Sequence, residues 1–185
     1  MSDALARDDV IPVEAAVTLD GLFRERVKRT PNLVAYRYFD DQDGAWHEYT
    51  WAQMNARIAR WQTALERDGV KAGDRVAIML RNSPEWVMCD IAALGLGLVV
   101  VPLYIQDRPD NVAYIMNNAG CRVLLFEGPE QWSALAEVRD QLGGLVRMLS
   151  VRKIESGGEA RLKAIDDWLP PSAGETRQDT FCRDG

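Results

Sequence analysis

The sequence is poor in the residues that build catalytic and metal centres. Its 185 residues contain one histidine and three cysteines. Cys89, Cys121 and Cys182 lie far apart, without the paired spacing of a zinc site or of a disulfide framework. We interpret them as the reduced thiols of a cytoplasmic protein. Cysteine-based metal binding and disulfide cross-links are therefore not expected.

Long apolar runs and basic runs are also missing. The longest apolar run, Ile91–Ile105, contains Gly95, Gly97 and Pro102 and falls short of the roughly 20 residues that span a bilayer. Met1–Val17 is acidic where a signal peptide would be basic and then apolar. The net charge is −6, and no stretch of Lys and Arg indicates binding to a phosphate backbone. We expect no transmembrane segment and no nucleic-acid partner.

What the sequence does contain is ordinary globular composition. Apolar residues make up 47% and charged residues 27%, which excludes disordered and collagen-like chains. The length predicts one domain, and a compact fold of this size buries roughly 70% of the surface of its unfolded chain. A real hydrophobic core is expected without help from a metal or a disulfide.

The N-terminal third predicts a short helix followed by a β-hairpin. Thr18 is a helix N-cap, and the helix ends before Pro31. Leu33–Phe39 and Trp46–Thr50 are rich in aromatic and β-branched residues and flank the polar turn at residues 40–44. This arrangement is typical of two antiparallel strands.

A longer amphipathic helix follows the hairpin. Thr50 and Gln53 form a capping box, and the helix is expected to end near Gly69. Its apolar residues fall three and four apart: Trp51, Met54, Ile58, Trp61 and Leu65. The stripe could also be a coiled-coil seam, but two heptads are too few. We therefore expect this helix to pack against a sheet.

The remaining sequence alternates strands with helices. Strands are predicted at Arg75–Leu80, Leu98–Leu103, Arg122–Phe126 and Arg147–Val151. Helices are predicted at Pro84–Leu94, from Pro109 to Gly120, at Pro129–Leu142 and at Ala160–Leu169. Such alternation indicates right-handed βαβ units and a mainly parallel sheet. The predicted fold class is α/β, with an N-terminal helix and β-hairpin before the βαβ units.

No glycine-rich segment is suited to hold phosphates. Gly95 and Gly97 begin like a dinucleotide fingerprint, but Val100 stands at the third glycine position and the run precedes a strand. The turn Asp41–Gly44 imitates the middle of a calcium loop. Phe39 stands at that loop's first ligand position, so a solvated turn is the better interpretation.

The remaining candidates for chemistry are also weak. Asp166 and Asp167 are adjacent, and adjacent helical side chains diverge too far to bind one metal or to act as an acid and base pair. His47 lies in a predicted strand without a nucleophile near it, so a cross-strand or surface position is expected. Trp61 and Trp86 lie on apolar helix faces and are expected in the core. We predict no catalytic, cofactor-binding or metal-binding residue in this chain.

The stretch Tyr49–Tyr104 resembles the N-terminal region of the adenylate-forming acyl-CoA ligases. Four pieces carry the resemblance, in an order and spacing like those of the family. They are YTWAQM at Tyr49–Met54, GV-x-x-GDRVAI at Gly69–Ile78, NSPEW at Asn82–Trp86 and VPLY at Val101–Tyr104. Weaker similarity extends from Thr18 to about Phe126. The NSPEW segment followed by Asp90, together with VPLY, looks most like the long-chain fatty acid ligases.

The resemblance implies a two-step reaction for a longer parent protein of fatty acid metabolism. ATP and a fatty acid would give an acyl adenylate and pyrophosphate, and CoA would then give acyl-CoA and AMP, with Mg²⁺ at the phosphates. The family's phosphate loop, adenine and ribose sites and lid lysine lie downstream of the matched region. ATP, Mg²⁺ and CoA are thus expected for the parent and not for this chain. Peripheral membrane association of the parent stays open.

The expected organisation is a flexible segment at 1–17, part of a larger N-terminal domain at 18–169, and a linker at 170–185 that stops before the phosphate loop. We expect an inactive N-terminal fragment that self-associates through uncovered surfaces. Two alternatives remain. The chain could be a free-standing interaction or dimerisation module, or its parent could adenylate another carboxylate, such as an aryl or amino acid.

Overall fold

The computed structural model describes residues 10–173, which form two compact units, one up to Asn55 and one from Ala56 onward. Cys182 and the larger part of the expected linker at 170–185 lie outside the described residues. The described part of the expected flexible segment contains a one-turn helix, α1 (Val13–Ala16).

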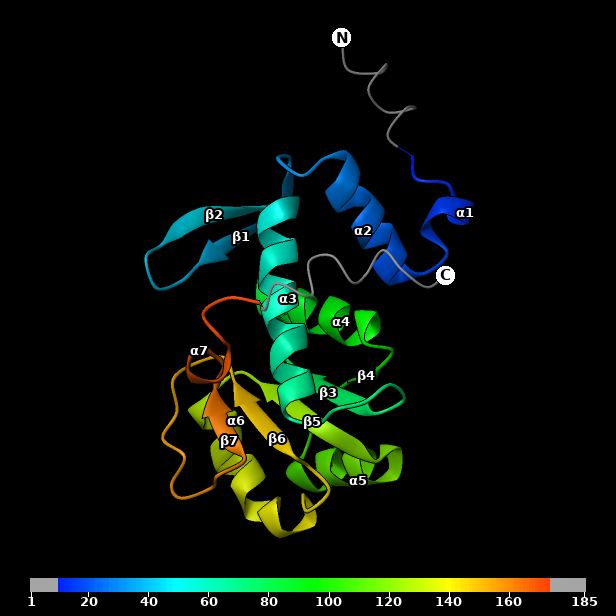
Figure 1. The fold of residues 1–185 in the computed structure, drawn as a ribbon. Coiled ribbons are helices and arrows are strands. Elements are labelled where there is room, and N and C mark those ends of the chain that lie inside the picture. The colour runs from blue at the N-terminus through cyan, green and yellow to red at the C-terminus, as the bar shows by residue number, and fades with distance from the viewer. Residues whose placement is uncertain (1–9, 174–185) are drawn as a thin grey trace. The chain divides into compact units, whose positions relative to one another are not determined.

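The first unit contains the predicted helix and hairpin. Helix α2 (Leu19–Arg29) begins at Thr18, whose hydroxyl accepts a hydrogen bond of 2.9 Å from the Gly21 N–H. Strands β1 (Val34–Asp40) and β2 (Ala45–Thr50) pair antiparallel (Figure 1). Both predictions are confirmed.

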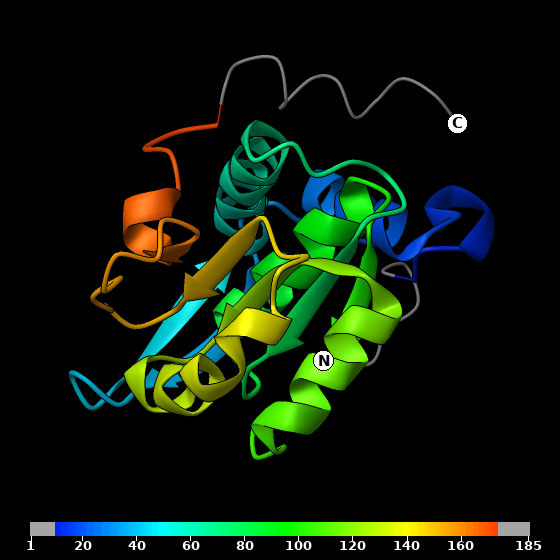
Figure 2. The same ribbon diagram turned by 90° about the horizontal axis from the view of Figure 1, so that it is seen from below.

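Helix α3 (Trp51–Arg67) begins with the predicted capping box. The Thr50 N–H donates to Gln53 Oε1 at 2.9 Å, and the Gln53 N–H donates to Thr50 Oγ1 at 3.2 Å. Of the residues in its apolar stripe, Trp51 is half-buried and the others are buried, Trp61 with only 1% exposure. The part of α3 that belongs to the second unit covers one face of the sheet of that unit (Figure 2), so the packing prediction is correct.

The second unit is a five-stranded parallel sheet with the strand order β4-β3-β5-β6-β7. Its strands are β3 (Arg75–Met79), β4 (Val99–Pro102), β5 (Cys121–Phe126), β6 (Arg147–Ser150) and β7 (Leu162–Ala164). Its other helices are α4 (Pro84–Gly95), α5 (Pro109–Ala119), α6 (Pro129–Leu135), the 3-10 helix η1 (Ala136–Gln141) and α7 (Ile165–Trp168). Helices α5 and α6 cover one face, and α3 and α4 cover the other (Figure 2). The α/β prediction is confirmed.

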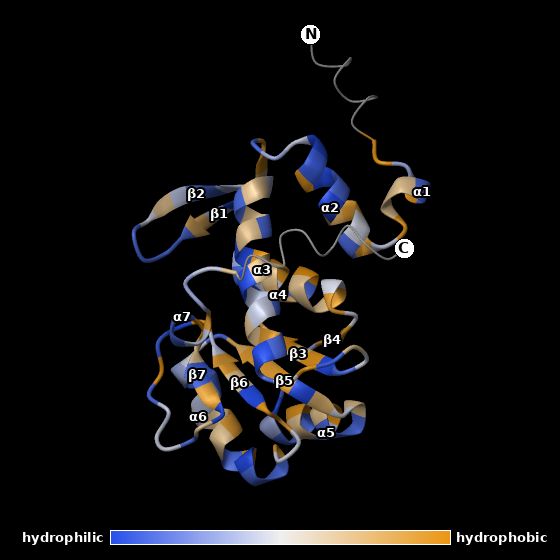
Figure 3. Cartoon of the chain, viewed as in Figure 1, coloured by the Kyte–Doolittle hydropathy of each residue, from blue (hydrophilic) through white to orange (hydrophobic). Residues whose placement is uncertain are grey.

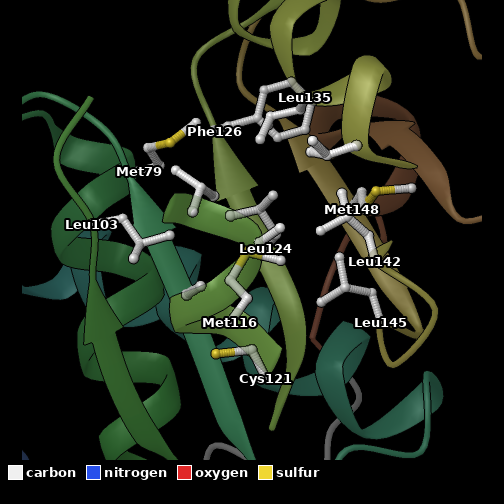
Figure 4. Packing of buried hydrophobic residues seen from close by; sticks show 14 of the residues in the cluster. Met79, Leu103, Met116, Cys121, Leu124, Phe126, Leu135, Leu142, Leu145 and Met148 are labelled. Atoms are coloured by element: carbon white, nitrogen blue, oxygen red, sulfur yellow. The ribbon is translucent and has the colours of Figure 1, made fainter. Parts of the chain in front are cut away.

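Buried apolar side chains fill both faces of this sheet. On the side of α5 and α6, Leu124 lies at the centre of a cluster that extends toward Leu103 at one end and Met148 at the other (Figure 4). Val123 and Leu125 alternate with Leu124 along β5 and are fully buried too. A parallel sheet covered on both faces needs such continuous apolar strands. In Figure 3, these strands are coloured mainly as hydrophobic, whereas the β1–β2 turn is coloured as hydrophilic.

Three local predictions were wrong. Pro129–Leu142 is not one α-helix, since α6 gives way to the 3-10 helix η1 after Leu135. Ala160–Leu169 contains the edge strand β7 before the short α7, because residues 162–164 pair with β6. Trp86 is half-buried, since the first turn of α4 lies at the margin of the core.

Candidate functional site

The strand order creates a topological switch point between β3 and β5. From β3 the chain crosses through α4 to β4 on one side, and it then returns through α5 to β5 on the other side of β3. In open α/β sheets, ligands bind outside the carboxyl ends of the strands at such a point. This edge is the position in the second unit that the fold itself marks as a candidate site.

Gln131 of α6 connects the chain segments that meet at this edge. Its side-chain oxygen accepts a hydrogen bond of 2.6 Å from the Glu127 N–H, just after β5. Its side-chain nitrogen lies 3.4 Å from the Met79 carbonyl, at the end of β3, and 3.5 Å from the Ile105 carbonyl, beyond β4. One amide therefore holds three strand ends in place.

An ion pair lies beside Gln131. Arg152, two residues after β6, contacts the Glu130 carboxylate. A backbone hydrogen bond and the Arg152 contact lower the pKa of Glu130 below its usual range. Gly128 lies against the same guanidinium, since a Cβ at this position would come within 2.7 Å of Arg152 Nε. A side chain at this position would displace the Arg152 guanidinium from where it now lies, and the arginine charge is compensated by Glu130.

The residues at this edge are poorly suited to bind the phosphates of a nucleoside triphosphate. Binding several phosphate oxygens requires converging backbone N–H groups and cations. At the start of α4, Pro84 has no N–H, and Ser83 Oγ already accepts from the Trp86 N–H. Arg81 is exposed nearby, and Glu127 adds a negative charge to the same edge, whereas the charge of Glu130 is compensated by Arg152. The polar side chains of Ser83, Gln131, Glu130 and Arg152 at this edge are engaged with groups of the chain itself.

A cavity of about 490 Å³ lies between η1 and the β6–β7 loop. Its charged lining residues are Arg139, Asp140, Glu159 and Arg161. Arg161 donates to Glu159 at 2.8 and 2.9 Å and to the Leu142 carbonyl at 3.1 Å. The hydrogen bond from Arg161 lowers the pKa of Glu159 to about 2. The charges compensate one another, so the cavity has no strong preference for an anion.

The structure places the residues singled out from the sequence as follows. Gly95 and Gly97 connect α4 to β4, so they precede a strand as predicted. Asp166 and Asp167 are both exposed on α7. His47 lies in β2 opposite Tyr38, with 40% of its side chain exposed. Within residues 10–173, no helix is long and apolar enough to cross a membrane.

The model of the AMP-binding enzyme family matches residues 23–180, and the chain belongs to this family. Two curated relatives are long-chain-fatty-acid–CoA ligases of Mycobacterium tuberculosis. FadD15 is 29% identical over 127 residues, which cover 69% of this chain and 21% of the relative. FadD13 is 32% identical over 108 residues, covering 58% and 21%. The chain thus spans about a fifth of the length of these relatives.

Solved structures agree with this assignment. The anthranilate CoA ligase AuaEII has a TM-score of 0.72 at 22% identity, over 88% of this chain and 29% of that one. The N-terminal domain of FACL13 from Mycobacterium tuberculosis has a TM-score of 0.61 at 28% identity, over 70% and 32%. The chain corresponds to the N-terminal part of such ligases, as the resemblance of Tyr49–Tyr104 implies.

Proposed function

We propose that this chain is the structural N-terminal part of a long-chain fatty acid CoA ligase. The whole enzyme would join a fatty acid to CoA through an acyl adenylate, with ATP, Mg²⁺ and CoA as its reactants and cofactors. The main support is the family match over residues 23–180 together with the fatty acid ligases among the relatives. The role of the chain is to build and stabilise the scaffold on which downstream residues act.

We propose further that the 185-residue chain is inactive by itself. The sequence has no Gly, Ser and Thr-rich loop followed by lysine. The carboxyl edge at the switch point is occupied by Gln131 and by the Arg152–Glu130 pair. Arg81 is exposed at that edge, but one side chain does not supply the converging donors that several phosphate oxygens need, so nucleotide binding would depend on residues beyond this chain.

A second candidate keeps the adenylating chemistry and changes the acid. Gramicidin S synthase 2 of Brevibacillus brevis is 28% identical over 110 residues, and a structural neighbour is an anthranilate CoA ligase. The shared scaffold therefore does not distinguish fatty from aryl or amino acids. A panel of carboxylates tested on the full-length enzyme separates these possibilities.

A third candidate is a free-standing interaction module, and the association state helps to separate it from a fragment. In the described part of the chain, β4 pairs with β3 alone, and Val99 on β4 is 51% exposed. An open edge strand recruits a partner strand, so we expect a fragment with this uncovered edge to self-associate. A clean monomer in sedimentation at high concentration would indicate a self-sufficient domain and favour the module. A stop codon directly after Gly185 in the gene would favour the module.

The deciding experiment compares the 185-residue chain with the product of a longer reading frame. Titration calorimetry measures Mg-ATP binding, and ATP–pyrophosphate exchange with palmitate measures adenylation. We expect both activities only in the longer product. Exchange by the short chain would refute the scaffold role, whereas a longer product inactive on every carboxylate class would refute the ligase assignment.

A further inference from the structure

The β1–β2 hairpin brings three ligand-type side chains together at its turn. Asp40 pairs with Ala45, and His47 pairs with Tyr38. Because side chains alternate along a strand, this register places Asp40 and His47 on the same face, as diagonal neighbours. Asp43 extends from the turn toward them. Among residues 10–173, only this group of three or more acidic, histidine or cysteine side chains has converging ligand atoms.

The distances suit a single ion. The carboxylate oxygens and the imidazole nitrogen all lie within 4.8 Å of one another. Donors bound to one zinc ion at roughly 2.0–2.2 Å lie about 3.4 Å apart in a tetrahedron. Side-chain rotations that move the ligand atoms by about 1 Å would therefore bring all three within bonding distance of one metal ion.

Local hydrogen bonds hold both carboxylates in position. The Gln42 N–H donates to Asp40 Oδ1 at 2.8 Å, and the Ala45 N–H donates to Asp43 Oδ1 at 3.0 Å. His47 Nε2 lies 2.7 Å from Asp43 Oδ2. Each carboxylate thus has one oxygen bound to the backbone, and the second oxygen of Asp43 faces His47 Nε2, where a metal ion would take the place of the shared proton.

Tyr38 supports the histidine from the neighbouring strand. Its ring lies 5.5 Å from the His47 ring, at an angle of 30°, and it also stacks on Tyr49 at 5.2 Å. Packing against a neighbouring ring reduces the number of orientations open to the imidazole. The histidine is therefore positioned as well as exposed.

We propose that Asp40, Asp43 and His47 form a binding site for a divalent transition metal of the Zn²⁺ type. One imidazole nitrogen and two carboxylate oxygens are ligands that Zn²⁺ accepts, whereas Ca²⁺ and Mg²⁺ prefer oxygen alone. Binding replaces the proton shared between His47 and Asp43, and water completes the coordination sphere. The ion would join strand β2 to the turn and stabilise the hairpin by mass action.

The test uses the fact that His47 is the only histidine of the 185 residues. Proton NMR of its imidazole is followed during a Zn²⁺ titration of the chain at neutral pH, and calorimetry measures the affinity. His47→Gln removes the imidazole, and Asp43→Asn removes a carboxylate. Asp41→Asn is the matched control, because Asp41 is exposed in the same turn but outside the group.

The proposal predicts saturable shifts of the imidazole signals with Zn²⁺ and none with Ca²⁺. Binding should disappear in His47→Gln, weaken at least about tenfold in Asp43→Asn and stay unchanged in Asp41→Asn. Absence of saturation refutes the site. Equal weakening in Asp43→Asn and Asp41→Asn also refutes it, because general charge attraction would then explain the binding. An unchanged near-ultraviolet spectrum shows that each variant is folded.

Discussion

Replacing Asp68 with asparagine should destabilise the second unit strongly. Asp68 follows α3, and its carboxylate accepts hydrogen bonds from Arg147 Nε at 2.7 Å, Arg147 Nη2 at 2.8 Å and Trp168 Nε1 at 2.7 Å. The Asp68 side chain is 7% exposed and that of Arg147 is 15% exposed. This carboxylate joins α3, β6 and α7, which lie far apart in the sequence.

The magnitude follows from what the substitution leaves behind. Asparagine has one acceptor oxygen for three donors, so the Arg147 charge loses its partner in a nearly buried position. Breaking a buried pair costs about 3–5 kcal/mol. Because Arg147 keeps some exposure and lies 3.4 Å from the Ala160 carbonyl, we expect the lower end, about 3 kcal/mol.

Urea unfolding followed by circular dichroism measures this change, and its pH dependence tests the cause. Burial raises the pKa of Asp68, but the hydrogen bonds from Arg147 and Trp168 and the charges of Arg147 and Arg67 outweigh it and lower the pKa. The ionised Asp68 carboxylate therefore contributes its full stabilisation of the folded state above the unfolded-state pKa of about 3.9. This stabilisation is lost as the pH falls through the lower folded-state pKa. The difference between wild type and Asp68→Asn should shrink in that acidic range.

Asp140→Asn is the matched control. Asp140 is fully exposed beside Arg139, so its substitution should leave the free energy of unfolding unchanged within error. A loss below about 1 kcal/mol in Asp68→Asn, or a difference that stays constant down to acidic pH, would refute the structural role of this carboxylate.

The other predictions concern packing, backbone conformation and thiol reactivity. Trp61→Ala should cost about 3–5 kcal/mol in urea unfolding because Trp61 is buried, whereas half-buried Trp86→Ala should cost about 1 kcal/mol. Gly120→Ala should lower the free energy of unfolding by about 1 kcal/mol or more, since Gly120 has a φ of +65° and a Cβ would collide with Arg75. Gly143→Ala is the control, because a Cβ there meets open space and the change should be nearly neutral. Burial and then the nearby Asp90 charge raise the pKa of Cys89, so iodoacetamide should label it only after unfolding, as read by peptide mass spectrometry.

The sequence predicted the secondary structure best where the signal is local. The cap of α2 and the capping box of α3 each join residues three positions apart. These residue types at a helix start typically bind backbone N–H groups of the first turn. Predictions failed where pairing with a distant strand decides the outcome. Residues 162–164 form a strand because β6 lies beside them, and no local pattern distinguishes them from a helix.

The candidate sites were less predictable than the elements. Gln131 looks like an ordinary helix residue, and its position at the switch point depends on the strand order. The prediction that His47 lies in a strand is confirmed. Its approach to Asp40 follows from the register of β1 and β2, and a shift of one residue would place the two side chains on opposite faces.

The sequence by itself determined the α/β class, the order of elements from α2 to β5 and membership of the AMP-binding family, because periodicity, caps and motifs lie in neighbouring residues. Only the tertiary structure decided the strand order, the switch point and the Asp68–Arg147 pair. The last joins residues 79 positions apart. Such contacts depend on how a sheet is assembled and in which register. Their geometry is a property of the packed chain, which local patterns do not encode.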